Sequence, residues 1–129
     1  MTINMTTDRT TDATAVEHFL HGQVACWNAG DKDGFFAHYR ALAPAGLSIE
    51  YVGHASQQPD AWLMLEGMWM QQNSKFRIEV KACIVNGNEA ACHHRNALRD
   101  GEGNSDGIET IELYRFFDGR LEVRYFISK

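Results

Sequence analysis

The sequence predicts an α+β fold in which helices come first and an antiparallel sheet follows. Two observations lead to this prediction. Between residues 13 and 72, apolar residues mostly recur every three or four positions, which is the spacing of one helix face. From Phe76 onward they alternate with polar residues, as in a strand with one buried face. The 129 residues, 44% of them hydrophobic, suffice for one core.

The first helix is expected over Ala13–Asn28, with Thr11 or Asp12 as its cap. Its apolar positions recur at helical spacing and are Val16, Phe19, Leu20, Val24 and Trp27. Residues 1–11 are rich in Thr, Asp and Asn and cannot bury much apolar surface. We therefore expect them to form a disordered or loosely attached tail, and residues 12–129 to form a single domain.

Two further helices and a short strand are expected before the sheet. Asp31 is placed to cap a helix with the sequence DGFFAHYRAL, which ends before Pro44. Leu47–Val52 has the composition of a short strand. A third helix is expected from about Asp60 to Gln72. Because nearly every face of that helix is apolar, we expect it to be largely covered.

Four strands are then expected to form an antiparallel meander. They are Phe76–Ile84, Glu89–Leu98, Ile108–Phe117 and Arg120–Ser128. Asn86-Gly-Asn88 is interpreted as a three-residue turn and Asp118-Gly119 as a two-residue turn, because Asn and Gly accept the positive φ of tight turns.

Strand alternation assigns the residues of EAACHHRN (89–96) to two faces. The even-numbered apolar residues of Phe76–Ile84 define an inner face. With a three-residue turn, Cys92, His94 and Asn96 lie on that inner face, whereas His93 points outward.

The last hairpin places one carboxylate on the inner face. A two-residue turn pairs Arg115 with Glu122 as an outward ion pair, and it pairs Glu112 with Tyr125 on the inner face. The other inner positions of this hairpin are apolar or carry hydroxyls. We therefore expect a raised pKa for Glu112, which makes it a candidate acid or base.

Three stretches occur in a fixed order, namely WNAGDKDGF (27–35), IVNGNEA (84–90) and YRFFDGRL (114–121). With them the chain, over about residues 13–128, resembles the nuclear transport factor 2-like superfamily, and more narrowly its SnoaL-like and ketosteroid isomerase-like members. The resemblance implies a cone-shaped fold, in which N-terminal helices pack into a curved antiparallel β-sheet and a small-molecule pocket opens between them. Members include isomerases, polyketide cyclases, dehydratases and non-catalytic binding proteins.

The ketosteroid isomerase pattern matches this chain only in part. It places Glu112 where those enzymes carry the protonated aspartic acid of their oxyanion hole. The tyrosine of that oxyanion hole falls at Gln23, and the general-base aspartate falls at about Tyr51 or Val52. Because that base is absent, steroid isomerisation of the standard kind is not expected.

We expect a cofactor-independent acid–base site for an apolar ring or polyketide-like compound, of isomerase, cyclase or dehydratase type. Glu112 would be the acid or hydrogen-bond donor and His94 the base. The residues expected to contact ligand are Gln23, Trp27, Tyr51, His54, Trp62, Asn96, Tyr114 and Tyr125. The alternatives are a non-catalytic ligand-binding or protein-interaction domain, and a purely structural bond between Glu112 and His94 or Tyr125.

No metal and no cofactor are expected. One strand face offers only Cys92 and His94, and Glu112 would be needed as a third zinc ligand. The three cysteines, Cys26, Cys83 and Cys92, have no CxxC spacing and are expected to be reduced, buried thiols. Together with the polar N-terminus, this predicts a cytoplasmic protein.

Charge and surface pattern bear on the partners. The net charge of −5 and the scattered basic residues argue against nucleic acid, and no apolar run is long enough to span a membrane. Ile111, Leu113, Phe117 and Phe126 alternate with charged residues on the outer face of the sheet. Such an uncovered apolar face predicts a homodimer through the outer sheet face.

Overall fold

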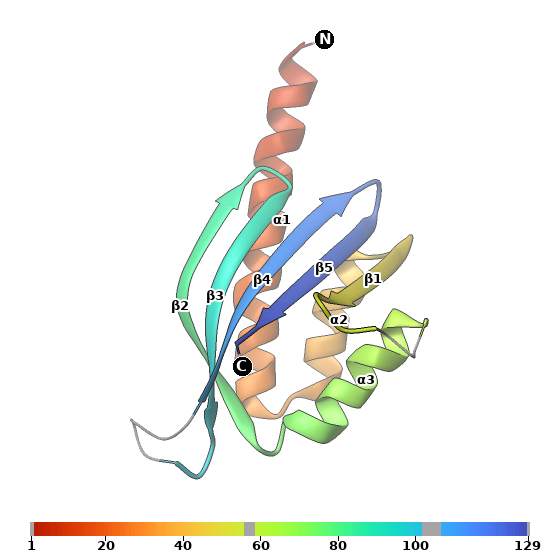
Figure 1. Ribbon diagram of the computed structural model, residues 1–129. Helices are drawn as coiled ribbons and strands as arrows, with labels where there is room; N and C mark the ends of the chain where they lie inside the picture. The colour runs from red at the N-terminus through yellow and green to blue at the C-terminus, as the bar shows by residue number, and fades with distance from the viewer. Residues whose placement is uncertain (1, 56–58, 102–106, 129) are drawn as a thin grey trace.

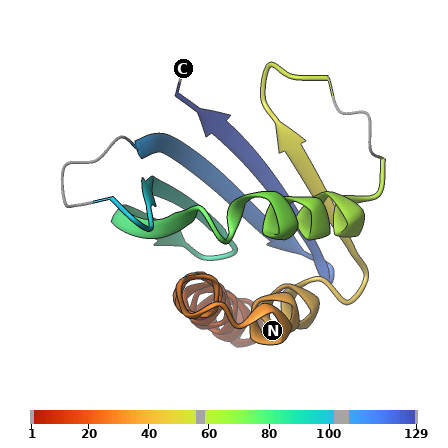
Figure 2. The ribbon, with the colours of Figure 1, turned by 90° about the horizontal axis from the view of Figure 1, so that it is seen from below.

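The computed structural model describes residues 2–55, 59–101 and 107–128, with side chains from Asp12 onward. Three helices pack against one curved, five-stranded sheet (Figures 1 and 2). The elements are α1 (Thr2–Ala29), α2 (Lys32–Leu42), β1 (Gly46–Tyr51), α3 (Ala61–Gln72), β2 (Phe76–Asn86), β3 (Glu89–Leu98), β4 (Gly107–Phe117) and β5 (Arg120–Ile127). The α+β prediction is confirmed.

The sheet has the strand order β1-β5-β4-β3-β2. Strands β2 to β5 form the expected antiparallel meander, and β1 joins its edge by a parallel pairing with β5. The sheet is therefore mixed rather than purely antiparallel. The β1 pairing is continued by Val52, whose backbone N–H donates to the Tyr125 carbonyl at 2.9 Å.

Helices α1 and α2 lie side by side on the concave face of the sheet, and α3 lies next to β1 at one end of the cone (Figures 1 and 2). The buried core between α1, α2 and the sheet is largely aromatic. Phe19 packs edge-on against Tyr39 and Tyr114, with ring centroids 4.8 and 5.6 Å apart. Among the described residues no helix has the length and apolar character needed to cross a membrane.

Two of the three helices begin where the sequence predicts. The Asp31 carboxylate accepts from the Gly34 N–H at 3.0 Å, and the Asp60 carboxylate accepts from the Trp62 N–H at 2.9 Å, as N-caps do. Helix α1 begins at Thr2 instead of near Ala13. Its first turns extend beyond the strands in Figure 1, and a loosely attached segment before residue 12 stays a prediction.

The prediction that the third helix is largely covered is wrong. Only Ala61 and Leu65 of α3 are buried, whereas Leu63 is 56% and Met70 71% exposed. The reason is geometric, because α3 lies across the end of the cone and meets the rest of the protein along one side only. The apolar residues on its other side face outward.

Two predictions for the β2–β3 hairpin, its turn length and its unbroken register, are wrong, and their effects on the faces of β3 cancel. The turn is the two-residue Gly87-Asn88, since Asn86 pairs with Glu89. A register shift between Val80 and Ala82 then inserts one extra residue into β2, as a β-bulge does. The expected inner face of β3 is therefore correct. The expected inner position of Ile84 is wrong, and this residue is 72% exposed.

The same bulge turns Cys83 toward the inner face, directly opposite Cys92. These two residues form a disulfide, so the expectation of reduced thiols is wrong for both. No local pattern in the sequence marks this pair, because an uninterrupted alternation places Cys83 on the outer face. Cys26 is a free cysteine, and its thiol lies 3.8 Å from the Asp31 carboxylate.

The outer face of the sheet carries the expected mixture of charge and apolar surface. The β4–β5 turn is Asp118-Gly119, and Arg115 forms the predicted ion pair with Glu122 at 3.7 Å. Ile111 and Phe126 are 42% and 37% exposed. The homodimer through this face stays a prediction.

Candidate functional site

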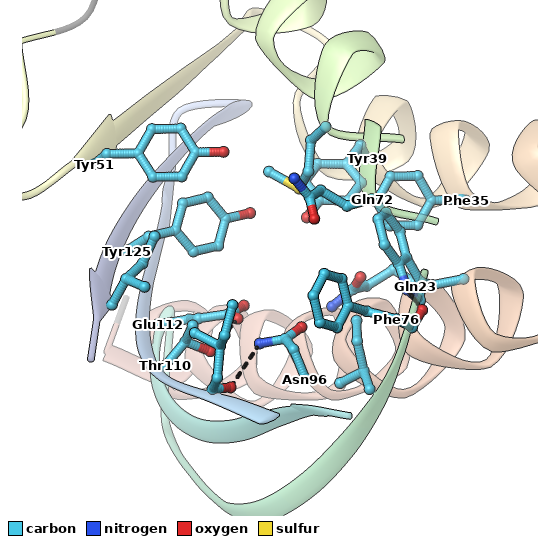
Figure 3. Close-up of a pocket in the computed structure, with 15 residues that line it drawn as sticks. Gln23, Phe35, Tyr39, Tyr51, Gln72, Phe76, Asn96, Thr110, Glu112 and Tyr125 are labelled. Carbon is cyan, nitrogen blue, oxygen red and sulfur yellow. Dashed lines mark hydrogen bonds between the residues drawn. The ribbon is translucent and has the colours of Figure 1, made fainter. Parts of the chain in front are cut away.

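A cavity of about 220 Å³ lies between the helices and the inner face of the sheet (Figure 3). Every helix and strand contributes to its wall. The lining residues are Gln23, Trp27, Phe35, Tyr39, Tyr51, Met68, Gln72, Phe76, Ile78, Asn96, Ile108, Thr110, Glu112, Tyr125 and Ile127. Glu112 is the only acidic or basic residue among them. The site therefore combines a mostly apolar and aromatic wall with one carboxylate.

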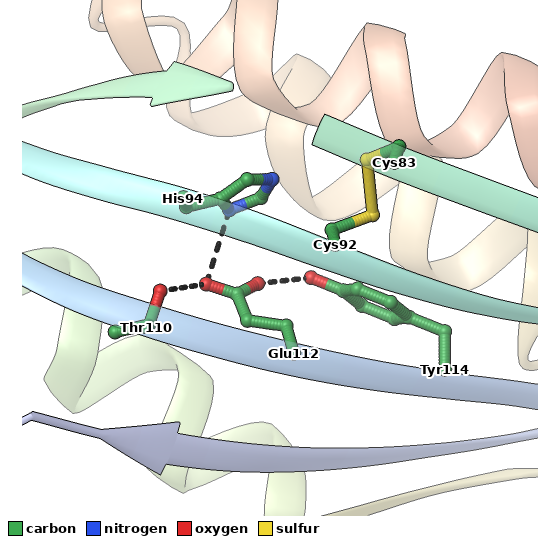
Figure 4. Close-up of a disulfide and its surroundings, with 6 residues drawn as sticks. All are labelled: Cys83, Cys92, His94, Thr110, Glu112 and Tyr114. Atoms are coloured by element: carbon green, nitrogen blue, oxygen red, sulfur yellow. Dashed lines mark hydrogen bonds and ion pairs between the residues drawn. A yellow bond between two sulfur atoms is a disulfide. The ribbon is translucent and has the colours of Figure 1, made fainter. Parts of the chain in front are cut away.

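Three side chains donate hydrogen bonds to Glu112 (Figure 4). Its Oε2 accepts from His94 Nδ1 at 3.1 Å and from the Thr110 hydroxyl at 2.9 Å. Its Oε1 accepts from the Tyr114 hydroxyl. Glu112 is 7% exposed and His94 is 1% exposed, so this network is almost dry.

Strand register explains why these groups meet. Thr110, Glu112 and Tyr114 follow one another at two-residue spacing on β4, so they share a face. On β3, Cys92 lies opposite Glu112 and His94 lies opposite Thr110. His94 is therefore the diagonal neighbour of Glu112, within reach of its side chain.

The expectation of a raised Glu112 pKa is wrong. Burial does raise the pKa of this carboxyl group, but the hydrogen bond and electrostatic attraction of His94 lower it, and the Tyr114 and Thr110 hydroxyls lower it further. The net effect is a pKa below the ordinary value. Glu112 is thus an ionised acceptor at neutral pH rather than an acid.

Tyrosine hydroxyls complete the polar part of the cavity. Tyr51 and Tyr125 stack with ring centroids 5.3 Å apart, and both hydroxyls point into the cavity (Figure 3). Burial raises the pKa of Tyr125 well above its ordinary value, and the charge of Glu112 adds to this effect. Burial and then Glu112 also raise the pKa of Tyr51. These tyrosines are therefore neutral and can donate hydrogen bonds.

The structure brings together most of the side chains that the sequence suggested. Those that line the cavity with Glu112 are Gln23, Trp27, Tyr51, Asn96 and Tyr125. His94 and Tyr114 are not part of the cavity wall and instead hold Glu112 by hydrogen bonds. Trp62 packs against the core. His54 is exposed and lines an adjoining groove beside α3, which shares Tyr51, Met68, Gln72 and Ile127 with the cavity wall.

Sequence reasoning missed Phe35, Tyr39, Gln72 and Thr110 as cavity residues. Helical spacing marks Phe35 and Tyr39 only as the apolar side of their helix. In a cone the core and the cavity share a wall, so that apolar side is itself a signal for lining residues. Thr110 shares the inner face of β4 with Glu112, and its two-residue spacing was a sufficient signal.

Among the described residues, one cluster brings metal-ligating atoms together. It consists of Cys83, Cys92 and His94, whose ligand atoms lie within 4.8 Å of one another. The two sulfur atoms are joined in the disulfide (Figure 4). Cys92 and His94 are 1% exposed, and Cys83 is half-buried.

No family model and no curated protein matches the sequence. Solved structures do match. A candidate ketosteroid isomerase from Kribbella flavida has a TM-score of 0.68 at 14% identity, over 90% of this chain and 79% of that one. An NTF2-like protein of unknown function from Mesorhizobium loti has a TM-score of 0.64 at 17% identity, over 91% and 93%. A candidate SnoaL-like polyketide cyclase from Jannaschia has a TM-score of 0.63 at 18% identity, over 92% and 86%.

These identities are low, so the likeness concerns the fold. The fold and its cavity define a cone-shaped α+β domain with a pocket between helices and sheet. More narrowly, the chain has the nuclear transport factor 2-like fold, and ketosteroid isomerase-like and SnoaL-like structures are among those that it resembles.

Proposed function

We propose that this protein binds a small molecule with an apolar ring in its cavity, and that Glu112 takes a proton from that molecule as a general base. The observation that carries this proposal is a carboxylate, 7% exposed, on an otherwise largely apolar and aromatic cavity wall, and its lowered pKa keeps it ready to accept a proton. The roles first expected for Glu112 and His94 are thereby exchanged. Glu112 is the base, and His94 is a positioning residue behind it.

The hydrogen bonds around Glu112 leave one position for a ligand. A carboxylate offers about four acceptor positions, two on each oxygen. Oε2 accepts from His94 and Thr110, whereas Oε1 accepts from Tyr114. Oε1 therefore has room for one more donor, and Glu112 lies on the cavity wall where that donor would come from a bound molecule.

A ring ketone shows how such a site would work. Glu112 takes the proton from a carbon next to the carbonyl group, and the electron pair of that C–H bond moves onto the carbonyl oxygen. The Tyr51 hydroxyl points into the cavity and would donate a hydrogen bond to that oxygen (Figure 3). In a ketone with a neighbouring C=C bond, return of the proton from Glu112 to the far carbon of that bond gives isomerisation. Attack of the enolate carbon on a second carbonyl group, whose oxygen then takes the proton back from Glu112, gives cyclisation.

The names of two structural neighbours support this class of substrate. One is described as a candidate ketosteroid isomerase and one as a candidate SnoaL-like polyketide cyclase. Both names refer to apolar compounds that carry carbonyl groups. The aromatic wall of the cavity, which includes Trp27, Phe35 and Phe76, is suited to such rings.

A second candidate function is ligand binding without chemistry. It is favoured by the lowered pKa of Glu112, because a general base is most effective when its pKa lies near the working pH. In that case Glu112 would accept a hydrogen bond from a ligand hydroxyl and transfer no proton.

Deuterium exchange tests the catalytic proposal. 2-Tetralone, a two-ring ketone, is incubated in D₂O with the protein, and loss of the proton signals next to its carbonyl group is followed by NMR. We expect the wild type to accelerate exchange, and we expect the exchange rate with Glu112→Gln to be at least tenfold lower than with the wild type. Glu109→Gln is the matched control, because Glu109 lies on the same strand but pairs outward with His93 at 2.6 Å.

Each outcome of this experiment is informative. Equal exchange by wild type and Glu112→Gln rejects Glu112 as the base. Saturable binding of 2-tetralone without exchange supports the second candidate. If the protein binds neither 2-tetralone nor 2-naphthol, a two-ring phenol, the ring-binding pocket itself is rejected.

A further inference from the structure

The inner face of β2 and β3 holds a cluster of which the proposed function uses only His94, as a positioning residue for Glu112. The ligand atoms of Cys83, Cys92 and His94 lie within 4.8 Å of one another. From the sequence only Cys92 and His94 shared a face. The β-bulge in β2 supplies the third group, because it turns Cys83 toward them.

We propose that Cys83, Cys92 and His94 bind a zinc ion when the disulfide is reduced. Two thiolates and one imidazole are a donor set that Zn²⁺ prefers, and three protein ligands leave the fourth tetrahedral position to water. This inference is independent of the ligand that occupies the cavity.

The hydrogen bond of His94 fits this role. Its Nδ1 donates to Glu112, so Nε2 is the nitrogen left for a metal. The second ring nitrogen lies on the side of the ring that faces the two cysteines in Figure 4. Metal-binding histidines almost always donate their other N–H to a carboxylate or carbonyl, which fixes the ring and strengthens the ligand. Glu112 already provides this support.

The site also has a route to solvent. Strand β2 is the last strand of the sheet, and its Cys83 is half-buried, whereas Cys92 and His94 are 1% exposed. A small reductant or a metal ion can therefore approach from the β2 edge. The other two ligands are kept away from water.

The disulfide and the zinc site exclude each other, because a sulfur atom in a disulfide is not a thiolate. Two molecules of a small thiol reduce the Cys83–Cys92 disulfide. The disulfide takes up two electrons and two protons and becomes two thiols, and the two small thiols are oxidised to a disulfide of their own. Zinc then displaces the two thiol protons and forms two Zn–S bonds. The cluster thus has an oxidised, metal-free state and a reduced, metal-binding state.

Metal titration of the full chain tests the proposal. The protein is reduced with a phosphine under anaerobic conditions, desalted and titrated with Zn²⁺ against a chromophoric chelator, and with Co²⁺ as a spectroscopic probe. We expect one Zn²⁺ per chain, and with Co²⁺ the thiolate charge-transfer and intense d–d bands of a tetrahedral site. The oxidised protein should show neither.

Three variants assign the ligands. Cys26→Ala removes the cysteine outside the cluster and should bind like the wild type. Cys83→Ser, at a half-buried edge position, and His94→Gln should each lose at least 100-fold in zinc affinity while circular dichroism confirms that they are folded. If His94→Gln fails to fold, Cys83→Ser alone decides.

Three zinc-binding results would overturn the proposal. They are absence of zinc binding by the reduced wild type, zinc binding by Cys83→Ser as tight as that of the wild type, and equal binding by the oxidised and reduced protein. A cobalt complex without thiolate bands would likewise assign the metal to another place.

Discussion

Thr110→Val isolates one of the three hydrogen bonds that hold Glu112. Valine has nearly the shape of threonine but lacks the hydroxyl group, which donates to Glu112 Oε2 at 2.9 Å. Thr110 is 7% exposed, so water cannot easily replace the lost donor. The substitution therefore measures how much this donor contributes to the stability of the folded protein.

The magnitude follows from two opposing effects. A hydrogen bond to a charged group contributes about 1.5–3 kcal/mol. The additional buried methyl group of valine returns about 0.8 kcal/mol. Thr110→Val should therefore lower the free energy of unfolding by about 1–2 kcal/mol. Thr110→Ser is the matched control, since it keeps the hydroxyl and should cost only about 0.8 kcal/mol for the lost methyl group.

Urea unfolding at neutral pH, with linear extrapolation to water, measures both variants. A double-mutant cycle with Glu112→Gln then separates the charge. In the Glu112→Gln background Thr110→Val should cost roughly 1 kcal/mol less than in the wild type, because a bond to a neutral acceptor is weaker. If Thr110→Val is as stable as the wild type, Glu112 is not an ionised acceptor held by this hydroxyl.

Three further predictions concern pH, helix docking and assembly. The folded state lowers the pKa of Glu112. The ionised carboxylate therefore contributes fully to stability above the ordinary carboxyl pKa, and this contribution is lost as the pH falls through the folded pKa. The difference in unfolding free energy between wild type and Glu112→Gln should accordingly shrink in acid. Arg99 donates hydrogen bonds to the backbone carbonyls of Asn73, Asn28 and Trp27. Arg99→Ala should therefore lower the free energy of unfolding in urea by about 2 kcal/mol or more. A loss below about 0.5 kcal/mol would contradict a stabilising role for these three bonds. Light scattering should give a dimer mass for the wild type and a monomer mass for Phe126→Glu, and a monomeric wild type rejects the sheet interface.

The fold was largely predictable because its signals are local. Alternation over residues 108–127 and the turn Asp118-Gly119 set the register of the last hairpin, and Asp31 and Asp60 mark two helix starts. The bulge in β2 was not predictable, since neither a Gly nor a break in composition marks Lys81. The exposure of α3 depends on where the helix docks, which its mostly apolar sequence does not specify.

The candidate site was likewise predictable only in part. The inner position of Glu112 followed from strand parity, but the direction of its pKa shift did not, because that depends on the number of donors that reach a buried carboxylate. Thr110 and Tyr114, two residues to either side, could have been recognised as such donors from spacing alone. The Cys83–Cys92 disulfide depends on the bulge in β2 and therefore could not be predicted from the sequence.

Both candidate functions require an ionised Glu112 with an open acceptor position that faces a ring compound in the cavity. Calorimetric titration with 2-naphthol and with its methyl ether, which cannot donate a hydrogen bond, tests this most directly. The wild type should bind 2-naphthol roughly tenfold more tightly than the ether, since one charge-assisted hydrogen bond contributes about 1.4 kcal/mol or more. Glu112→Gln should lose most of that preference. Equal affinity of the wild type for both compounds would contradict the role proposed for Glu112.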